Sequence, residues 1–236
     1  MSRLRVAFLD ASHNDETTKR NFRRELDADL VEFDASGGHL PSSFDYDAVA
    51  ISGSRASVYW DEEWITNLVD WVAEAVDRGI PVLGVCFGHQ VVAEALGGTV
   101  DDMGSFELGY TEVEHTGDSL LFDGVDERFT VFTSHGDAVT ELPPGAEPIA
   151  ANEYGNHGFR KGHCFGVQFH PEYDTDTAEK IARSKGEFLG DERIQSVLAG
   201  ITPENYAAAC EVKQLFDNFL QYASQVREES TSTATV

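Results

Sequence analysis

The stretch PVLGVCFGHQVVAEALGG, residues 81–98, contains the transition that decides the fold. Its first residues form a short apolar run typical of a buried strand, and the rest has the apolar spacing of a helix. Cys86 stands at the junction, between Gly84 and Gly88. Flanking glycines permit a tight strand-to-helix turn, so we interpret the cysteine as a nucleophile on an elbow of the G-x-S-x-G type. On these residues alone, a small buried cysteine among tolerated glycines remains the alternative.

An elbow at this position has two chemical consequences. It presents the sulfur of Cys86 at the carboxyl end of the sheet and at the N-terminus of a helix, where the helix dipole favours a thiolate. The backbone N–H of Phe87, the next residue, then becomes a donor for an oxyanion.

Strand and helix patterns alternate around this elbow. Helical spacing follows the first strand in residues 14–26, and a second helix is predicted from Trp60 to Gly79 with Asp61, Glu62 and Glu63 in its first turn. This alternation predicts an α/β fold with a mostly parallel sheet and helices on both faces. The predicted strands lie in the apolar runs at 4–9, 28–33, 46–54 and 80–85.

The pattern changes after residue 98. Short strand-like pieces separated by Gly, Asp and Pro continue to residue 169 and favour mixed or antiparallel strands. Helical spacing returns from Thr175 to Leu189 and from Pro203 to about Val226. The 236 residues show no internal repeat and no linker rich enough to divide the chain, so one compact domain is expected.

Composition excludes several classes of function. The formal charge is −25, from 42 acidic and 17 basic residues, and such a surface repels phosphate backbones, so no nucleic-acid partner is expected. We interpret the dispersed acids as an adaptation to high salt, which screens their mutual repulsion. Three cysteines without a C-x-x-C spacing indicate neither a disulfide framework nor a zinc knuckle. With no signal peptide and no membrane-spanning run, a cytoplasmic protein is expected.

A second motif, GVQFHPEYD at 166–174, supplies a base for the cysteine. The apolar run before it predicts a strand that delivers His170, and Pro171 excludes helix there. His170 and Glu172 are then expected to project to the same side. A carboxylate beside an imidazole fixes the tautomer and raises the basicity, as the third group of a catalytic triad does. The alternative is a surface turn with an incidental histidine.

Two smaller features complete the predicted site. Gly53 follows an apolar run in AISGSRASVYW, where backbone can approach a ligand. Ser134, His135 and Asp137 follow another apolar run in FTSHGDAV. Both stretches also suit ordinary turns.

Taken together, GVCFGHQ, TSHGD and FGVQFHPE resemble the motifs of class I (triad-type) glutamine amidotransferase domains, with most similarity to the GMP synthetase-like branch. The resemblance covers residues 1–190 and implies a flavodoxin-like fold without a cofactor or metal. It implies that Cys86 is the nucleophile, His170 the acid and base, and Glu172 the residue that orients His170. The implied oxyanion donors are the amides of Gly53 and Phe87, and the implied substrate contacts are Gln90, Ser134 and His135.

Two departures from that pattern indicate a stand-alone member of the family. His89 occupies a position where GMP synthetases usually have methionine, and SGSRASVYWDEEWI replaces the usual Gly-Gly-Pro loop, which bears on the role of Gly53. No synthetase domain follows, so an ammonia acceptor is expected on another subunit or not at all. We expect His89 to be a packing residue rather than a rival base. Strand alternation points His157, His163 and Cys164 in different directions.

The leading hypothesis is a glutamine amidotransferase that hydrolyses the glutamine side-chain amide through a cysteine thioester. A γ-glutamyl peptidase or hydrolase with the same Cys-His-Glu triad is the nearest alternative. A third is a regulatory or binding subunit that keeps the fold without the chemistry. The acceptor and the oligomeric state stay open.

The C-terminal part lies outside the resemblance. Residues 191–227 are interpreted as a helical extension, and residues 228–236 as a disordered tail. Val212, Leu215, Phe216 and Phe219 share one helical face, which is expected to pack on the domain. A docking surface for a synthetase or for a second copy is the alternative.

Overall fold

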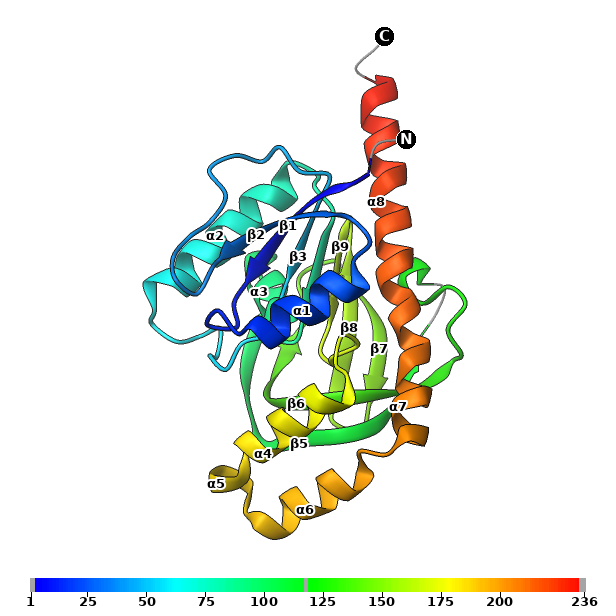
Figure 1. Ribbon diagram of the computed structural model, residues 1–236. Coiled ribbons are helices and arrows are strands. Elements are labelled where there is room, and N and C mark those ends of the chain that lie inside the picture. Colours follow the sequence, from blue (N-terminus) through cyan, green and yellow to red (C-terminus); the bar gives the residue numbers. More distant parts are fainter. Residues whose placement is uncertain (1–2, 117–118, 234–236) are drawn as a thin grey trace.

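The protein, seen here as a computed structural model that describes residues 3–116 and 119–233, is built around one twisted sheet (Figure 1). The sheet order is β2-β1-β3-β4-β9-β8-β7-β5-β6. Its first five strands are parallel and the others pair antiparallel. The parallel strands are β1 (Arg5–Asp10), β2 (Asp29–Asp34), β3 (Ala48–Ile51), β4 (Val82–Val85) and β9 (Cys164–Val167). The antiparallel strands are β5 (Thr99–His115), β6 (Arg128–Glu141), β7 (Glu147–Asn152) and β8 (Gly155–Lys161).

Helices cover both faces of the parallel half. In β1, Val6 and Phe8 pack in a cluster with α1 (Glu16–Glu25) and α8 (Gln214–Thr233), while Ala7 and Leu9 pack in a second cluster with α2 (Glu63–Asp77) and α3 (Phe87–Ala95). This period of two is the expected alternation of a strand that is buried on both faces. The flavodoxin-like α/β architecture predicted from the sequence is confirmed.

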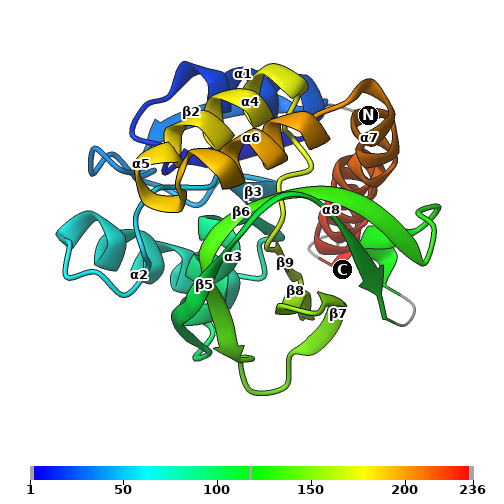
Figure 2. The same ribbon diagram turned by 90° about the horizontal axis from the view of Figure 1, so that it is seen from below.

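Four helices that follow the last strand lie below the sheet in the orientation of Figure 1 and in front of it in the view from below (Figure 2). They are α4 (Thr175–Ser184), α5 (Gly186–Leu189), α6 (Asp191–Gly200) and α7 (Pro203–Cys210). The single-turn segments are η1 (Leu120–Phe122) and η2 (Glu211–Lys213). Helices α4 and α6 contact one another, α6 contacts β5, and α4 contacts both β5 and β6. The link between α4 and α6 therefore lies next to the antiparallel strands β5 and β6.

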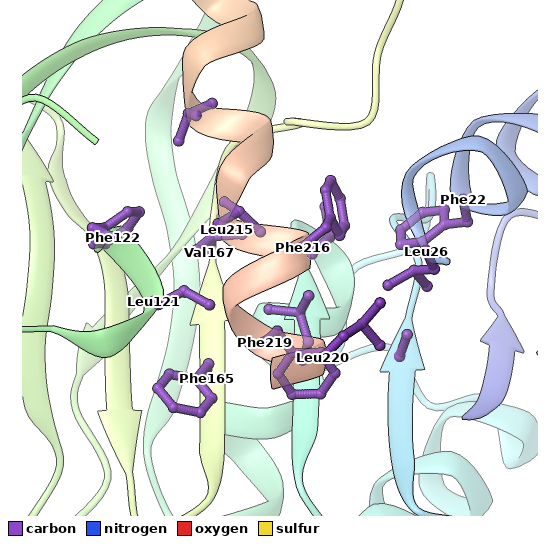
Figure 3. Close-up of a cluster of buried hydrophobic side chains, with 14 of the residues drawn as sticks. Phe22, Leu26, Leu121, Phe122, Phe165, Val167, Leu215, Phe216, Phe219 and Leu220 are labelled. Atoms are coloured by element: carbon purple, nitrogen blue, oxygen red, sulfur yellow. The ribbon is translucent and has the colours of Figure 1, made fainter. Parts of the chain in front are cut away.

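The C-terminal helix is part of the core. Figure 3 shows Leu215, Phe216, Phe219 and Leu220 of α8 between the side chains of α1 and those of η1 and β9. The ring of Phe216 lies edge-on to Phe22, with centroids 6.2 Å apart. The prediction that this face packs on the domain is confirmed, because Val212, Leu215, Phe216 and Phe219 are buried. These side chains are consequently not available to a synthetase or a second copy.

Three local expectations were wrong. Helix α2 begins at Glu63, so Trp60 lies before it and is exposed. The expected short strands at 99–116 and 129–134 are parts of two long strands, β5 and β6, because they pair along almost their whole length. Helix α8 continues to Thr233, so residues 228–233 are helical rather than disordered, and residues 234–236 lie outside the described part.

Across residues 3–116 and 119–233, the structure contains no helix that is both long and apolar enough to cross a membrane.

Candidate active site

The predicted site residues meet where neighbouring parallel strands end. Gly53 follows β3, Cys86 follows β4, and His170 follows β9, and these three strands are adjacent in the sheet. Ligand sites of open α/β sheets lie at this carboxyl edge. The sheet therefore brings together residues that lie far apart in the sequence, such as Gly53 and His170.

The elbow has the strained geometry that its sequence predicts. Cys86 has φ 54° and ψ −105° and precedes the first residue of α3, Phe87. A Cβ on Gly84 would lie 2.2 Å from the carbonyl oxygen of Gly88, and a Cβ on Gly88 would lie 2.5 Å from the carbonyl oxygen of Ile51. Only glycine fits at both positions, so the turn holds the sulfur above the helix N-terminus. The sulfur-bearing side chain is 5% exposed.

His170 and Glu172 form the predicted pair. Nδ1 of His170 lies 2.9 Å from Oε1 of Glu172, and the ring of Tyr173 stacks on the imidazole with centroids 4.1 Å apart. Burial by itself lowers the pKa of His170, but the neighbouring Cys86 and Glu172 outweigh burial and raise that pKa to about 10. The buried imidazole is therefore held in its charged form between a carboxylate and the sulfur.

Gly53 lies between the nucleophile and the base. A Cβ at this position would lie 2.9 Å from Cε1 of His170 and 3.6 Å from Cβ of Cys86. Phe87 is the first residue of α3, and backbone N–H groups of a first helical turn have no acceptor within the helix. Gly53 therefore lies beside Cys86, although the loop that follows it differs from the usual Gly-Gly-Pro loop. The amide of Phe87 has no acceptor within the helix and can donate to an oxyanion.

A pocket of about 670 Å³ opens over the sulfur. The three residues predicted to contact substrate, Gln90, Ser134 and His135, line it together with Cys86 and Phe87. A smaller cavity of about 50 Å³ is lined by Gly53, His170 and Glu172 among others, and it shares Ser134 with the large pocket. The pocket therefore unites the predicted nucleophile with the predicted substrate contacts.

A chain of amide side chains, partly missed in the sequence, supports the sulfur. Nε2 of Gln168 lies 3.6 Å from Sγ of Cys86, and its Oε1 accepts from Nε2 of Gln90 at 3.3 Å. The Gln90 amide also donates to the carbonyl of Asp137 at 3.4 Å. Gln168 lies two residues before His170 in the motif GVQFHPEYD. Residues two apart on a strand point to the same side, and this spacing could have indicated that Gln168 lies near the site.

The TSHGD segment lies inside β6 rather than in a turn. It pairs with β5 beside an irregularity between Asp102 and Glu107, and His135 is buried there. His135 donates through Nδ1 to the carbonyl of Asp137 at 3.0 Å, and its Nε2 lies 2.7 Å from Oε2 of Glu107. Burial raises the pKa of Glu107, but the interactions with His135 and His157 outweigh it and lower that pKa to about 2. Glu107 was not predicted from the sequence.

Cationic and aromatic side chains at the pocket mouth were also missed. Arg55, Lys185 and Arg193 line the pocket, as do Trp60 and Phe188. The ammonium of Lys185 lies 5.2 Å from the centroid of the Phe106 ring, and Arg193 donates to the carbonyl of Phe106. These residues come from the loop after β3 and from the α4–α6 segment, which carry no motif.

The remaining candidates occupy packing positions. His89 is buried on α3 against the ring of Phe159, with centroids 5.0 Å apart, and burial lowers its pKa to about 3. This agrees with its expected role as a packing residue. Nδ1 of His163 lies 2.6 Å from the hydroxyl of Tyr222, and burial raises the pKa of Cys164 to about 12. His157 is buried beside Glu107 and forms no cluster with His163 and Cys164 among the described residues.

Comparison with known proteins agrees with this geometry. The family described as glutamine amidotransferase class-I matches residues 9–185. A GMP synthase (glutamine-hydrolysing) of Azoarcus sp. (strain BH72) is 34% identical in an alignment of 212 residues that covers 80% of this chain and 38% of that protein. The protein of the same description from Thermobifida fusca is 40% identical in an alignment of 133 residues that covers 53% of this chain and 23% of that protein. The chain therefore spans well under half of these curated relatives.

Solved structures show the same fold over nearly the whole chain. A glutamine amidotransferase from Thermotoga maritima has a TM-score of 0.78 at 24% identity, with 93% of this chain and 99% of that chain covered. A glutamine amidotransferase from Methylobacillus flagellatus has a TM-score of 0.73 at 18% identity, with 96% of this chain and 95% of that chain covered.

Proposed function

The chain belongs to the class I glutamine amidotransferase family, and from this premise we propose that it hydrolyses the side-chain amide of glutamine with Cys86, His170 and Glu172 as its triad. The observation that carries the proposal is the meeting of a strained Cys86 with the His170–Glu172 pair around Gly53. A cysteine among glycines for packing alone would not require a charged, buried imidazole next to it.

The first half of the proposed reaction forms a thioester. The Cys86 thiolate attacks the carboxamide carbon, a C–S bond forms, and the carbonyl π electrons move to the oxygen. The amides of Gly53 and Phe87 donate to this oxyanion. When the intermediate collapses, the C–N bond breaks and His170 gives its proton to the departing ammonia.

The second half releases glutamate. His170, now neutral, takes a proton from water as the water oxygen attacks the thioester carbon. The C–S bond then breaks and the thiolate of Cys86 is restored. Gln90 and the backbone at Ser134 and His135 hold the α-amino and α-carboxylate groups of the substrate, in a pocket that they line.

The test measures ammonia and glutamate released from glutamine by the purified chain in molar salt, with Cys86→Ala as the matched variant. We expect release that depends on Cys86, since no thioester forms without the sulfur. An equal rate in Cys86→Ala would overturn the mechanism. Trapping of a γ-glutamyl adduct on Cys86 by mass spectrometry gives a readout that does not depend on turnover.

The size and charge of the pocket favour a second candidate, hydrolysis of larger γ-glutamyl compounds. A pocket of about 670 Å³ exceeds what one glutamine fills, and Arg55, Lys185 and Arg193 line it in a chain with only 17 bases. These cations suit a second carboxylate, such as that of a γ-glutamyl dipeptide. A higher kcat/KM for the dipeptide than for glutamine would favour this candidate, and a loss of that preference in Arg193→Ala would assign it to the pocket mouth.

For the ammonia, we propose a synthetase-type acceptor partner, because the curated relatives are glutamine-hydrolysing GMP synthases of which this chain matches one part. A glutaminase rate that rises when an acceptor enzyme and its nucleotide substrate are added would support this acceptor. Binding without any turnover, with or without the acceptor, would instead support a regulatory subunit.

The localisation that we propose is a reducing cytoplasm, which the free cysteines Cys86, Cys164 and Cys210 fit.

A further inference from the structure

Three side chains from three antiparallel strands converge in the interior next to the substrate pocket. They are Glu107 of β5, His135 of β6 and His157 of β8. Each is buried, and one potential ligand atom of each lies within 4.8 Å of the other two. Nε2 of His135 and Nε2 of His157 lie 2.7 Å and 3.1 Å from the same oxygen, Oε2 of Glu107. Two imidazoles and a carboxylate thus face one point.

The hydrogen bonds at this point are incomplete. Among the described residues, neither ring nitrogen of His157 has a hydrogen-bond partner, although its side chain is only 1% exposed. The 3.1 Å approach to Glu107 therefore lacks hydrogen-bond alignment. A buried polar atom without a partner is unfavourable, and native structures contain few of them.

In its neutral form, His135 carries its single proton on Nδ1 and leaves Nε2 unprotonated. A neutral histidine has one N–H, and the carbonyl of Asp137 accepts it from Nδ1 at 3.0 Å. Nε2 then presents a lone pair to the carboxylate oxygen of Glu107, 2.7 Å away. In this neutral form two lone pairs face one another at that distance, and a proton or a cation between them would attract both.

The surroundings are those of a ligand set with outer support. Histidine ligands usually donate their second nitrogen to a carbonyl, and carboxylate ligands are themselves hydrogen-bonded. His135 donates to the Asp137 carbonyl, and Oε1 of Glu107 accepts from the amide of Asn152 at 2.7 Å. Oε2 of Glu107, Nε2 of His135 and Nε2 of His157 remain for a metal.

We propose that Glu107, His135 and His157 bind one divalent transition-metal ion, with Zn²⁺ as the best match to two imidazoles and a carboxylate. Metal–ligand distances of about 2.0–2.2 Å in a tetrahedron separate the ligand atoms by roughly 3.3–3.5 Å. The 2.7 Å approach of His135 to Glu107 therefore widens by about 0.6–0.8 Å on binding, and the 3.1 Å approach of His157 by about 0.2–0.4 Å. The ion joins β5, β6 and β8 behind the pocket wall that His135 forms.

The experiment uses the full chain without an affinity tag. We expect about one bound Zn²⁺ per chain by elemental analysis after exposure to Zn²⁺ and removal of the free ion. Zn²⁺ at roughly a hundred times its Kd is expected to raise the melting temperature by about 5 °C or more. Bound Co²⁺ is expected to show visible d–d bands without the near-ultraviolet bands of a thiolate ligand, which excludes the three cysteines as its source.

Two variants separate the site from its surroundings. His157→Gln removes one ligand but keeps a polar side chain, and it is expected to lose the bound metal and the thermal shift. His163→Gln is the matched control, because His163 bonds Tyr222 outside the cluster and its loss is expected to leave both unchanged. Folding of each variant is verified by circular dichroism before metal is added.

The outcome is independent of the hydrolase chemistry. Cys86→Ala is expected to bind the metal as the natural chain does, so an inactive enzyme and an absent metal site remain distinguishable. A natural chain that retains no metal and shows no thermal shift overturns the proposal. Equal binding by His157→Gln overturns it as well.

Discussion

Nδ1 of His170 lies 2.9 Å from Oε1 of Glu172, and this contact orients the imidazole that faces Cys86. The change Glu172→Gln keeps the shape but removes the carboxylate, so we expect kcat/KM to fall by about a hundredfold or more. Initial rates of γ-glutamyl hydrolysis measure this fall. An effect below about tenfold would show that Glu172 is not the orienting group.

The same contact sets a pH dependence. The pKa of His170 is raised from 6.5 to about 10, so its charge contributes to stability below pH 6.5 and this contribution is lost as pH rises toward 10. Because Glu172 is one cause of the raised pKa, Glu172→Gln is expected to move the alkaline limb of the rate profile to lower pH. Rate profiles of both proteins test this, and an unmoved limb contradicts it.

The glycines of the elbow predict a stability effect. A Cβ on Gly84 meets the backbone of Gly88 at 2.2 Å, so Gly84→Ala is expected to lower the free energy of unfolding by about 3 kcal/mol or more. Gly186→Ala is the control, since nothing lies within 4 Å of its Cβ position. Urea unfolding compares them, and similar midpoints would show that the elbow relaxes freely.

At Cys86, the backbone conformation predicts that glycine stabilises the protein relative to alanine. At φ 54° and ψ −105° any side chain is strained, whereas glycine is not. We therefore expect Cys86→Gly to be more stable than Cys86→Ala by roughly 1 kcal/mol, although glycine is usually the less stable of the two. Thermal unfolding of the two inactive proteins is the measurement. A more stable alanine variant would mean that the strain is relieved elsewhere.

The packing of α8 predicts a large loss from a single truncation. Phe219 is buried against Phe165, so Phe219→Ala is expected to cost about 3–5 kcal/mol of stability. Gln221→Ala on the exposed side of the same helix is expected to change stability by no more than about 0.5 kcal/mol. Equal effects of the two changes in chemical unfolding would contradict the placement of this helix.

How much the sequence predicts depends on how local the signal is. Gly84, Cys86 and Gly88 specify the elbow within five residues, and His170 and Glu172 lie two positions apart, so both were recognised. Glu107, His135 and His157 meet only through the pairing of β5, β6 and β8, and no short motif records that pairing. Trp60 has helical spacing with Trp64, but helix α2 begins only at Glu63.

The burial of α8 has a consequence for the order of events during synthesis. Phe22 and Phe165 lie on opposite sides of this helix, and both are covered by residues near the end of the chain. While the ribosome is still translating, one face of the parallel strands therefore remains open and apolar. The nascent protein is exposed to aggregation, or to a chaperone that binds such surfaces, until α8 has left the exit tunnel.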